Sequence, residues 1–88
     1  MNIREGFVLR RVMGKAMVIA VGSLAQEFRA MITLNDTAED LWTWLQEDVS
    51  EEILVARLCD TYEVSADVAA ADVRRLLDTL RAEGILEE

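Results

Sequence analysis

The sequence predicts a small α+β domain of the winged helix-turn-helix type, in which a three-stranded antiparallel sheet is followed by three helices. The N-terminal third has the residue patterns of strands, and the remainder has amphipathic helical patterns that begin at capping residues. A length of 88 residues leaves room for one hydrophobic core. We therefore expect a single domain over residues 1–88, with the element order β-β-β-α-α-α.

The first two strands are expected over residues 6–12 and 16–21, which are both rich in strand-forming residues. The segment Met13-Gly14-Lys15 separates them and contains a glycine. Two strand-like segments joined by so short a turn are typical of a β-hairpin.

A third strand is expected over residues 28–33, where the side chains alternate between two faces. One face has Phe28, Ala30 and Ile32, and the other has Arg29, Met31 and Thr33.

Three helices are expected over residues 36–47, 51–62 and 66–83, each with an apolar stripe at helical spacing. Asn35 or Asp36 can cap the first helix, and serines precede the other two. On the first helix, Trp42 falls on the apolar stripe and is expected in the core. Trp44 lies about 200° away around the helix and is expected at the edge of the core.

The composition opposes catalysis. The chain has no histidine, so the usual Ser-His and Cys-His nucleophile pairs cannot form. The carboxylates of Asp36, Glu39 and Asp40 share one helix start, where they are expected to be solvated and to complement the helix dipole rather than to bind a metal. The single Cys59 is expected to be a half-buried apolar residue. We expect neither enzymatic activity nor a bound cofactor or metal.

The charge of the chain opposes nucleic-acid and membrane binding. The formal net charge is −8, and such a surface repels phosphate groups. Arg74, Arg75 and Arg81 lie on the third predicted helix, which reads DNA in winged-helix regulators, but acidic residues are interleaved with them. The longest apolar segment, residues 16–21, is too short to span a bilayer. A cytoplasmic location is expected.

The third strand is the candidate binding element. A three-stranded sheet leaves outer edges with unpaired N–H and C=O groups, and residues 28–33 contain neither proline nor a long charge run to prevent pairing. The edge is either covered by the chain's own helices or open to an extended peptide that adds as a further strand.

Several segments together resemble PqqD-type proteins, the small peptide-recognition domains (RiPP recognition elements) of ribosomal-peptide biosynthesis. The resemblance covers nearly the whole chain, in length and in the order of elements. The segments are Glu5-Gly6-Phe7-Val8-Leu9-Arg10, Ile32-Thr33-Leu34-Asn35-Asp36-Thr37-Ala38 with Leu41-Trp42, Ala71-Asp72-Val73 followed by Leu76-Leu77 and Leu80, and Gly84-Ile85-Leu86.

This resemblance implies a non-catalytic adaptor that binds the leader region of a precursor peptide beside the third strand and against the third helix. The leader is then presented to a modifying enzyme, often a radical-SAM protein with iron–sulfur clusters. The peptide-binding residues expected on this basis are Phe28, Arg29, Ala30, Met31, Ile32, Thr33, Val68, Asp72, Arg75 and Leu76.

Two other functions are compatible with the predicted fold. A winged-helix regulator would bind DNA with an affinity that falls steeply with salt. A structural homodimer would use the open sheet edges to exchange or pair strands with a second copy. A homodimer is also compatible with the adaptor, because an edge that accepts a peptide can pair with itself.

Overall fold

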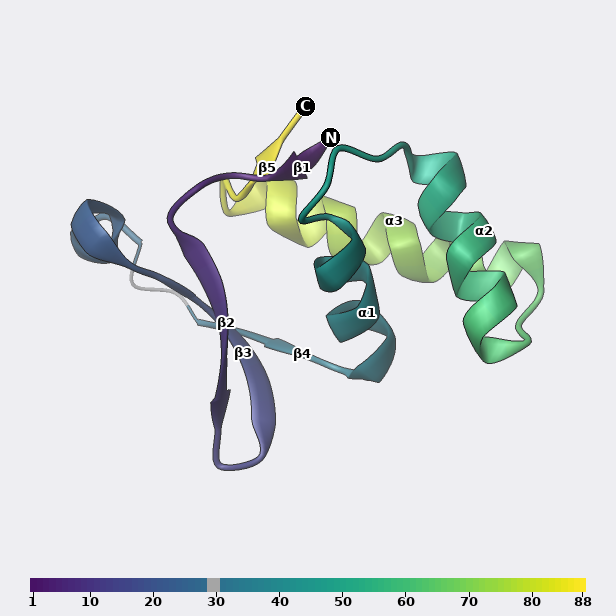
Figure 1. Ribbon diagram of the computed structural model, residues 1–88, viewed down its shortest axis with the longest axis horizontal. Coiled ribbons are helices and arrows are strands. Elements are labelled where there is room, and N and C mark those ends of the chain that lie inside the picture. Colours follow the sequence, from purple (N-terminus) through teal and green to yellow (C-terminus); the bar gives the residue numbers. More distant parts are fainter. Residues whose placement is uncertain (29–30) are drawn as a thin grey trace.

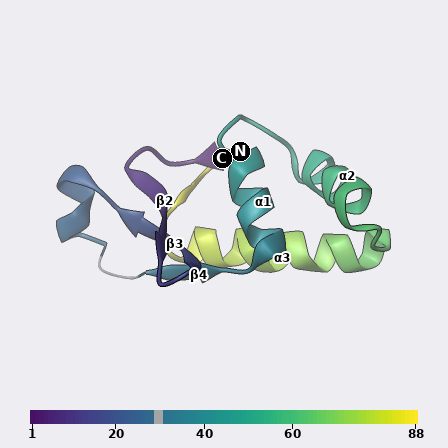
Figure 2. The ribbon, with the colours of Figure 1, turned by 60° about the horizontal axis from the view of Figure 1, so that its bottom comes forward.

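The computed structural model describes residues 1–28 and 31–88 and confirms the α+β fold class (Figure 1). A three-stranded antiparallel sheet of order β2-β3-β4 precedes three helices. The strands are β2 (Phe7–Val12), β3 (Lys15–Ala20) and β4 (Ile32–Leu34), and the helices are α1 (Asp36–Trp44), α2 (Glu51–Tyr62) and α3 (Ala66–Ala82). α3 runs along one side of the molecule, with α1 above it and the sheet toward its C-terminal end (Figure 2).

The predicted hairpin is formed by β2 and β3, with Val12 paired to Lys15 across a two-residue turn. Met13 and Gly14 both have positive φ, of 53° and 80°. This is the backbone of a type I′ turn, whose twist matches that of the two strands.

The third strand is shorter than predicted and begins later, because β4 covers only Ile32–Leu34. Before it, the chain forms a 3-10 helix, η1 (Gly22–Gln26), which the sequence left unassigned. The prediction that Phe28 lies in the strand is therefore wrong. The Phe28 ring packs edge-on against Phe7, with centroids 5.1 Å apart, and the Arg4 guanidinium lies 5.4 Å from its centre. These aromatic and cation–π contacts hold Phe28 beside β2 rather than in the sheet.

A second, two-stranded ladder was not predicted. β1 (Asn2–Ile3) pairs antiparallel with β5 (Leu86–Glu87), which places the two ends of the chain side by side (Figure 1). The N-terminal ammonium donates to an Asp48 carboxylate oxygen at 2.6 Å, and the Arg81 guanidinium donates two bonds to Glu88, of 3.0 and 2.8 Å. These polar contacts fasten the short ladder to the helical part.

The helices begin at the expected polar caps. Ser50 accepts a hydrogen bond from the Ile53 amide, and Ser65 accepts one from the Val68 amide. For α1, where two caps were possible, Asn35 is the residue that accepts, from the Ala38 amide at 2.9 Å. α2 has the predicted bounds, α3 is one residue shorter than predicted, and α1 ends three residues early, at Trp44.

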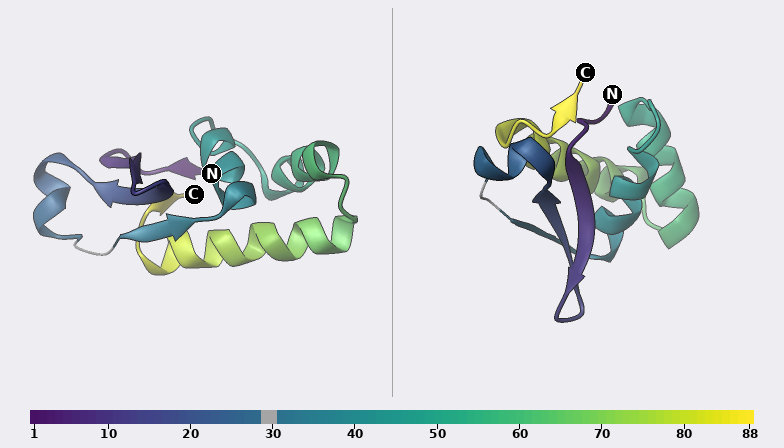
Figure 3. Two further views of the ribbon diagram at one scale, coloured as in Figure 1. Left: turned by 90° about the horizontal axis from the view of Figure 1, so that it is seen from below. Right: turned by 60° about the vertical axis from the view of Figure 1, so that its left-hand side comes forward.

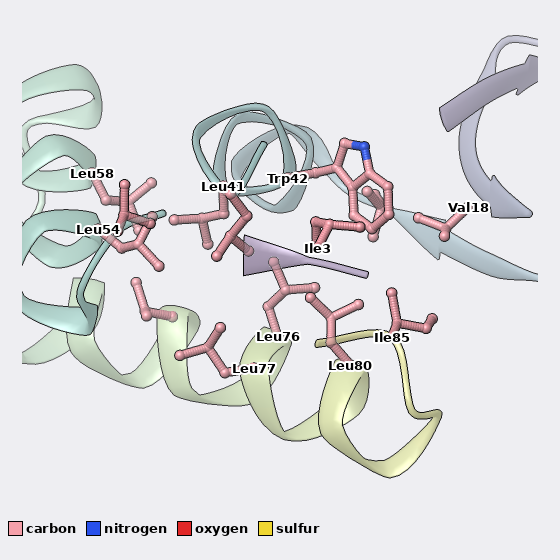
Figure 4. Packing of buried hydrophobic residues seen from close by; sticks show 14 of the residues in the cluster. Ile3, Val18, Leu41, Trp42, Leu54, Leu58, Leu76, Leu77, Leu80 and Ile85 are labelled. Carbon is pink, nitrogen blue, oxygen red and sulfur yellow. The ribbon is translucent and has the colours of Figure 1, made fainter. Parts of the chain in front are cut away.

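The core lies where the helices meet the inner face of the sheet. α3 contributes a continuous buried stripe of Ala69, Val73, Leu76, Leu77 and Leu80. Figure 4 shows Leu76 directed toward Leu41, and Leu80 directed toward Ile3. As predicted, Trp42 is buried, and Trp44 and Cys59 are half-buried. Among the described residues, no polar or charged residue is buried.

Candidate peptide-binding groove

Among the described residues, no strand pairs with the outer edge of β4. β4 is the outer strand of the sheet, and its register pairs Ile32 with Val18 and Thr33 with Met17. The Val21 amide donates to the Gly6 carbonyl at 2.8 Å, just beyond the paired residues Phe7 and Ala20. Counting back from this bond shows which residues of β3 bond to β2 and which bond to β4. Because antiparallel residues alternate in direction, Ile32 faces β3 and the N–H and C=O of Thr33 point away from the sheet.

This edge opens onto a cavity of about 450 Å³ between β4, the start of α1 and the outer face of α3. Figure 3 shows β4 running beside the C-terminal half of α3, and Figure 2 shows the same arrangement. The lining residues, which together define the groove, are Lys15, Ile32, Thr33, Leu34, Asn35, Thr37, Ala38, Leu41, Asp72, Arg75, Leu76 and Thr79.

The groove has an apolar floor and a polar rim. Leu34, Leu41 and Leu76 are buried members of the hydrophobic core, with Ile32 packed against them. Thr33 and Arg75 are exposed. Such a surface suits an extended peptide, because apolar side chains fit the floor while the backbone bonds to the strand edge.

Asp72 and Arg75 form the charged part of the α3 side. Their closest oxygen–nitrogen distance is 3.7 Å, which is an ion pair but is too long for a hydrogen bond. The Arg75 side chain is 76% exposed. Most of this side chain is therefore in contact with solvent beside the groove.

The groove brings together five of the ten predicted binding residues. Ile32 and Thr33 come from β4, and Asp72, Arg75 and Leu76 come from α3. Their joint position agrees with the predicted arrangement of strand and helix. Binding by these residues stays a prediction.

The other five predicted residues do not line the groove or cannot be assessed. Met31 and Val68 are exposed and lie outside the lining, and Phe28 packs against Phe7 instead. Arg29 and Ala30 lie outside the described residues. Val68 is one helical turn before Asp72, beyond the end of the groove, and its part in peptide binding stays a prediction.

Seven lining residues were missed by the sequence reasoning. Thr79 continues the α3 row at i+3 from Leu76, so helical spacing alone indicates it. Leu34 follows Ile32 at strand spacing and falls outside the predicted strand, which ended one residue too soon. The remaining missed residues are Lys15, Asn35, Thr37, Ala38 and Leu41. They belong to neighbouring elements, and only the folded packing places them here.

Within residues 1–28 and 31–88, no group of three or more His, Cys, Asp or Glu side chains is placed to hold a metal ion. In the same part of the chain, no helix combines the length and the apolarity needed to cross a bilayer.

Comparison with known proteins gives the family. The family model described as "Coenzyme PQQ synthesis protein D (PqqD)" matches residues 23–86, which include β4 and all three helices. The chain belongs to the PqqD family. The resemblance seen in the sequence is thereby confirmed. A search of curated proteins gives no match.

A solved structure supports the fold of this PqqD-family chain. It is described as "TbiB1 in Complex with the TbiA(beta) Leader Peptide" and matches with a TM-score of 0.77. The alignment covers 99% of this chain and 95% of that chain, at 22% sequence identity. The arrangement of sheet and helices is therefore shared over the whole length.

Proposed function

We propose that this protein is a non-catalytic adaptor that captures the leader region of a ribosomally made precursor peptide. The leader adds as a strand at β4, packs against α3, and is presented to a modifying enzyme of the radical-SAM type. The observation that carries the proposal is the unpaired edge at Thr33, which opens onto the apolar groove. The family and the TbiB1 fold, which was solved with a leader peptide, support it.

The two edges of the sheet differ in their suitability for strand addition. The outer edge of β2 carries the consecutive arginines Arg10 and Arg11, and charged side chains at an edge disfavour pairing with another strand. β4 has the sequence Ile-Thr-Leu, with no charge. Backbone pairing at β4 is therefore the less obstructed choice, and the adjoining groove adds burial for the peptide's side chains.

The chemistry of the groove is that of binding. Its charged side chains are Lys15, Asp72 and Arg75, and the chain as a whole contains no histidine. A reaction on the bound peptide is accordingly assigned to the partner enzyme, and this protein supplies position.

The test compares two substitutions at Thr33. Thr33→Pro removes the outward N–H of the edge, whereas Thr33→Ala shortens the side chain and keeps that N–H. The probe is a fluorescein-labelled synthetic leader of the short peptide encoded beside this gene, followed by fluorescence anisotropy. We expect Thr33→Ala to bind within about threefold of the parent and Thr33→Pro to lose about tenfold, near the upper end of the range for one neutral backbone hydrogen bond.

Circular dichroism and the unfolding midpoint show whether each variant is folded. A folded Thr33→Pro protein that binds the leader as tightly as Thr33→Ala would contradict strand addition at β4. The presenting role is tested separately, by measuring whether the protein accelerates modification of the full precursor and leaves a leaderless precursor unaffected.

A further inference from the structure

The groove differs in charge from the rest of the molecule. The chain has 17 acidic and nine basic residues, for a net charge of −8. The groove has two cations, Lys15 and Arg75, and a single anion, Asp72. A peptide lying in the groove thus meets a locally positive rim on an otherwise acidic protein.

Arg75 retains hydrogen-bonding capacity that Arg74 and Arg81 use in bonds to carboxylates. Arg74 donates to Glu51 at 3.0 Å, and Arg81 donates two bonds to Glu88. Arg75 approaches Asp72 only to 3.7 Å. Its planar guanidinium is therefore free to bind a carboxylate through two parallel N–H···O bonds.

We propose that the groove selects an extended peptide that carries an apolar residue and, two positions away, a carboxylate that pairs with Arg75. The inference rests on the proposed function and specifies the chemistry of its ligand. Side chains of a strand alternate between faces, so groove-facing residues are two positions apart. Arg75 and Leu76 are adjacent on α3 and both line the groove. An apolar side chain over Leu76 consequently places the next groove-facing side chain near Arg75.

Lys15 and Asp72 modify this selection in opposite directions. Lys15 lies at the start of β3 and adds positive potential to the rim. Asp72 competes with the peptide carboxylate for the Arg75 guanidinium. Removal of the Asp72 charge by Asp72→Asn is therefore expected to increase the affinity for an acidic peptide by about twofold to fivefold, the range of an exposed ion pair.

The experiment begins with a library of random 12-residue peptides displayed on phage and selected on the purified protein. The tightest selected sequence is synthesised with a fluorescein label, both as selected and with each Glu or Asp replaced by its amide. Both peptides are titrated at physiological salt, where long-range repulsion from the acidic surface is largely screened. We expect the carboxylate form to bind about threefold to tenfold more tightly than the amide form.

Matched arginine variants locate the effect. In Arg75→Gln, the ratio of the Kd of the amide form to the Kd of the carboxylate form should fall to about one. Arg74→Gln makes the same charge change one residue away, outside the groove, and should keep the preference. Amide chemical shifts of Thr33 and Leu76 in an NMR titration report whether the peptide occupies the groove.

The possible outcomes distinguish the carboxylate selection from the proposed strand addition. Selected peptides that occupy the groove without an acidic residue, or a preference that survives Arg75→Gln, overturn the carboxylate selection and leave the proposed strand addition intact. Failure of both the library and the neighbouring leader to bind in the groove overturns the proposed function and the selection with it. Loss of the preference in Arg75→Gln alone supports the inference.

Discussion

Gly6 has two independent reasons to be glycine. Its φ is +102°, a conformation that other residues rarely adopt, and a Cβ built there would lie 2.4 Å from the Leu24 Cδ1 atom. Gly14 also has a positive φ, of +80°, but no atom lies within 4 Å of the corresponding Cβ position. The two glycines therefore separate backbone strain from steric crowding.

We predict that Gly6→Ala lowers the free energy of unfolding by about 2–3 kcal/mol, because strain and crowding add. Gly14→Ala should cost about 1 kcal/mol from the backbone alone. Urea unfolding followed by circular dichroism measures both. Equal losses for the two variants would show that Leu24 adapts and that crowding at Gly6 is unimportant.

Tyr62 joins α2 to α1 through a hydrogen bond from its hydroxyl to an Asp40 carboxylate oxygen. This bond, reinforced by burial and by the negative charge of Asp40, raises the pKa of Tyr62 from 10.0 to about 12. The bond stabilises the neutral phenol only in the folded state. Its contribution is accordingly complete below pH 10 and is lost as the pH rises from about 10 to about 12.

Because Tyr62 is the single tyrosine of the chain, its phenolate absorbance can be followed without overlap from another tyrosine. We expect the folded protein to titrate near pH 12 and the Asp40→Asn variant to titrate closer to 10. Circular dichroism recorded over the same pH range separates titration of the folded protein from unfolding. An unchanged midpoint in folded Asp40→Asn would contradict the assignment.

At the scale of elements, local signals predict helices better than the third strand. Serine caps and apolar stripes are set by residues close in sequence, and α2 starts and ends at the predicted residues. The alternation from Phe28 to Thr33 is equally local, yet Phe28 contacts Phe7 and Arg4 far away in the chain. A two-residue periodicity contains no information on contacts with distant residues. The predicted start of the strand, at Phe28, was therefore too early in the sequence.

The residues of the groove likewise divide into those that local spacing predicts and those that only the folded packing brings there. The α3 row of Asp72, Leu76 and Thr79 can be read from helical spacing, and Ile32 and Thr33 from strand spacing. The first turn of α1 contributes Thr37 and Ala38 because the chain turns directly from β4 into the helix beside the cavity. That turn depends on the sheet order and the packing of α1 on α3, which spacing does not encode.

At the scale of the whole molecule, one core supports both the fold and the groove. Leu76 reaches the groove, whereas its neighbour Leu77 is fully buried, with 0% exposure (Figure 4). α3 thus lines the groove proposed to bind peptide on one face and packs into the core on the other. A domain of this size has little excess stability, so damage to the core should affect binding through the folded population.

We predict that Leu77→Ala lowers the free energy of unfolding by about 2–5 kcal/mol, the usual range for a cavity left by a buried leucine. Peptide affinity of the remaining folded protein should be unchanged, and saturating leader should raise the urea midpoint because it binds only the folded state.

Val68→Ala is the matched control on the same helix, since Val68 is 51% exposed and outside the groove. It should change stability by less than about 0.5 kcal/mol and leave binding intact. Weakened leader binding by a fully stable Val68→Ala protein would instead extend the binding surface one turn toward the start of α3, as the family resemblance implies.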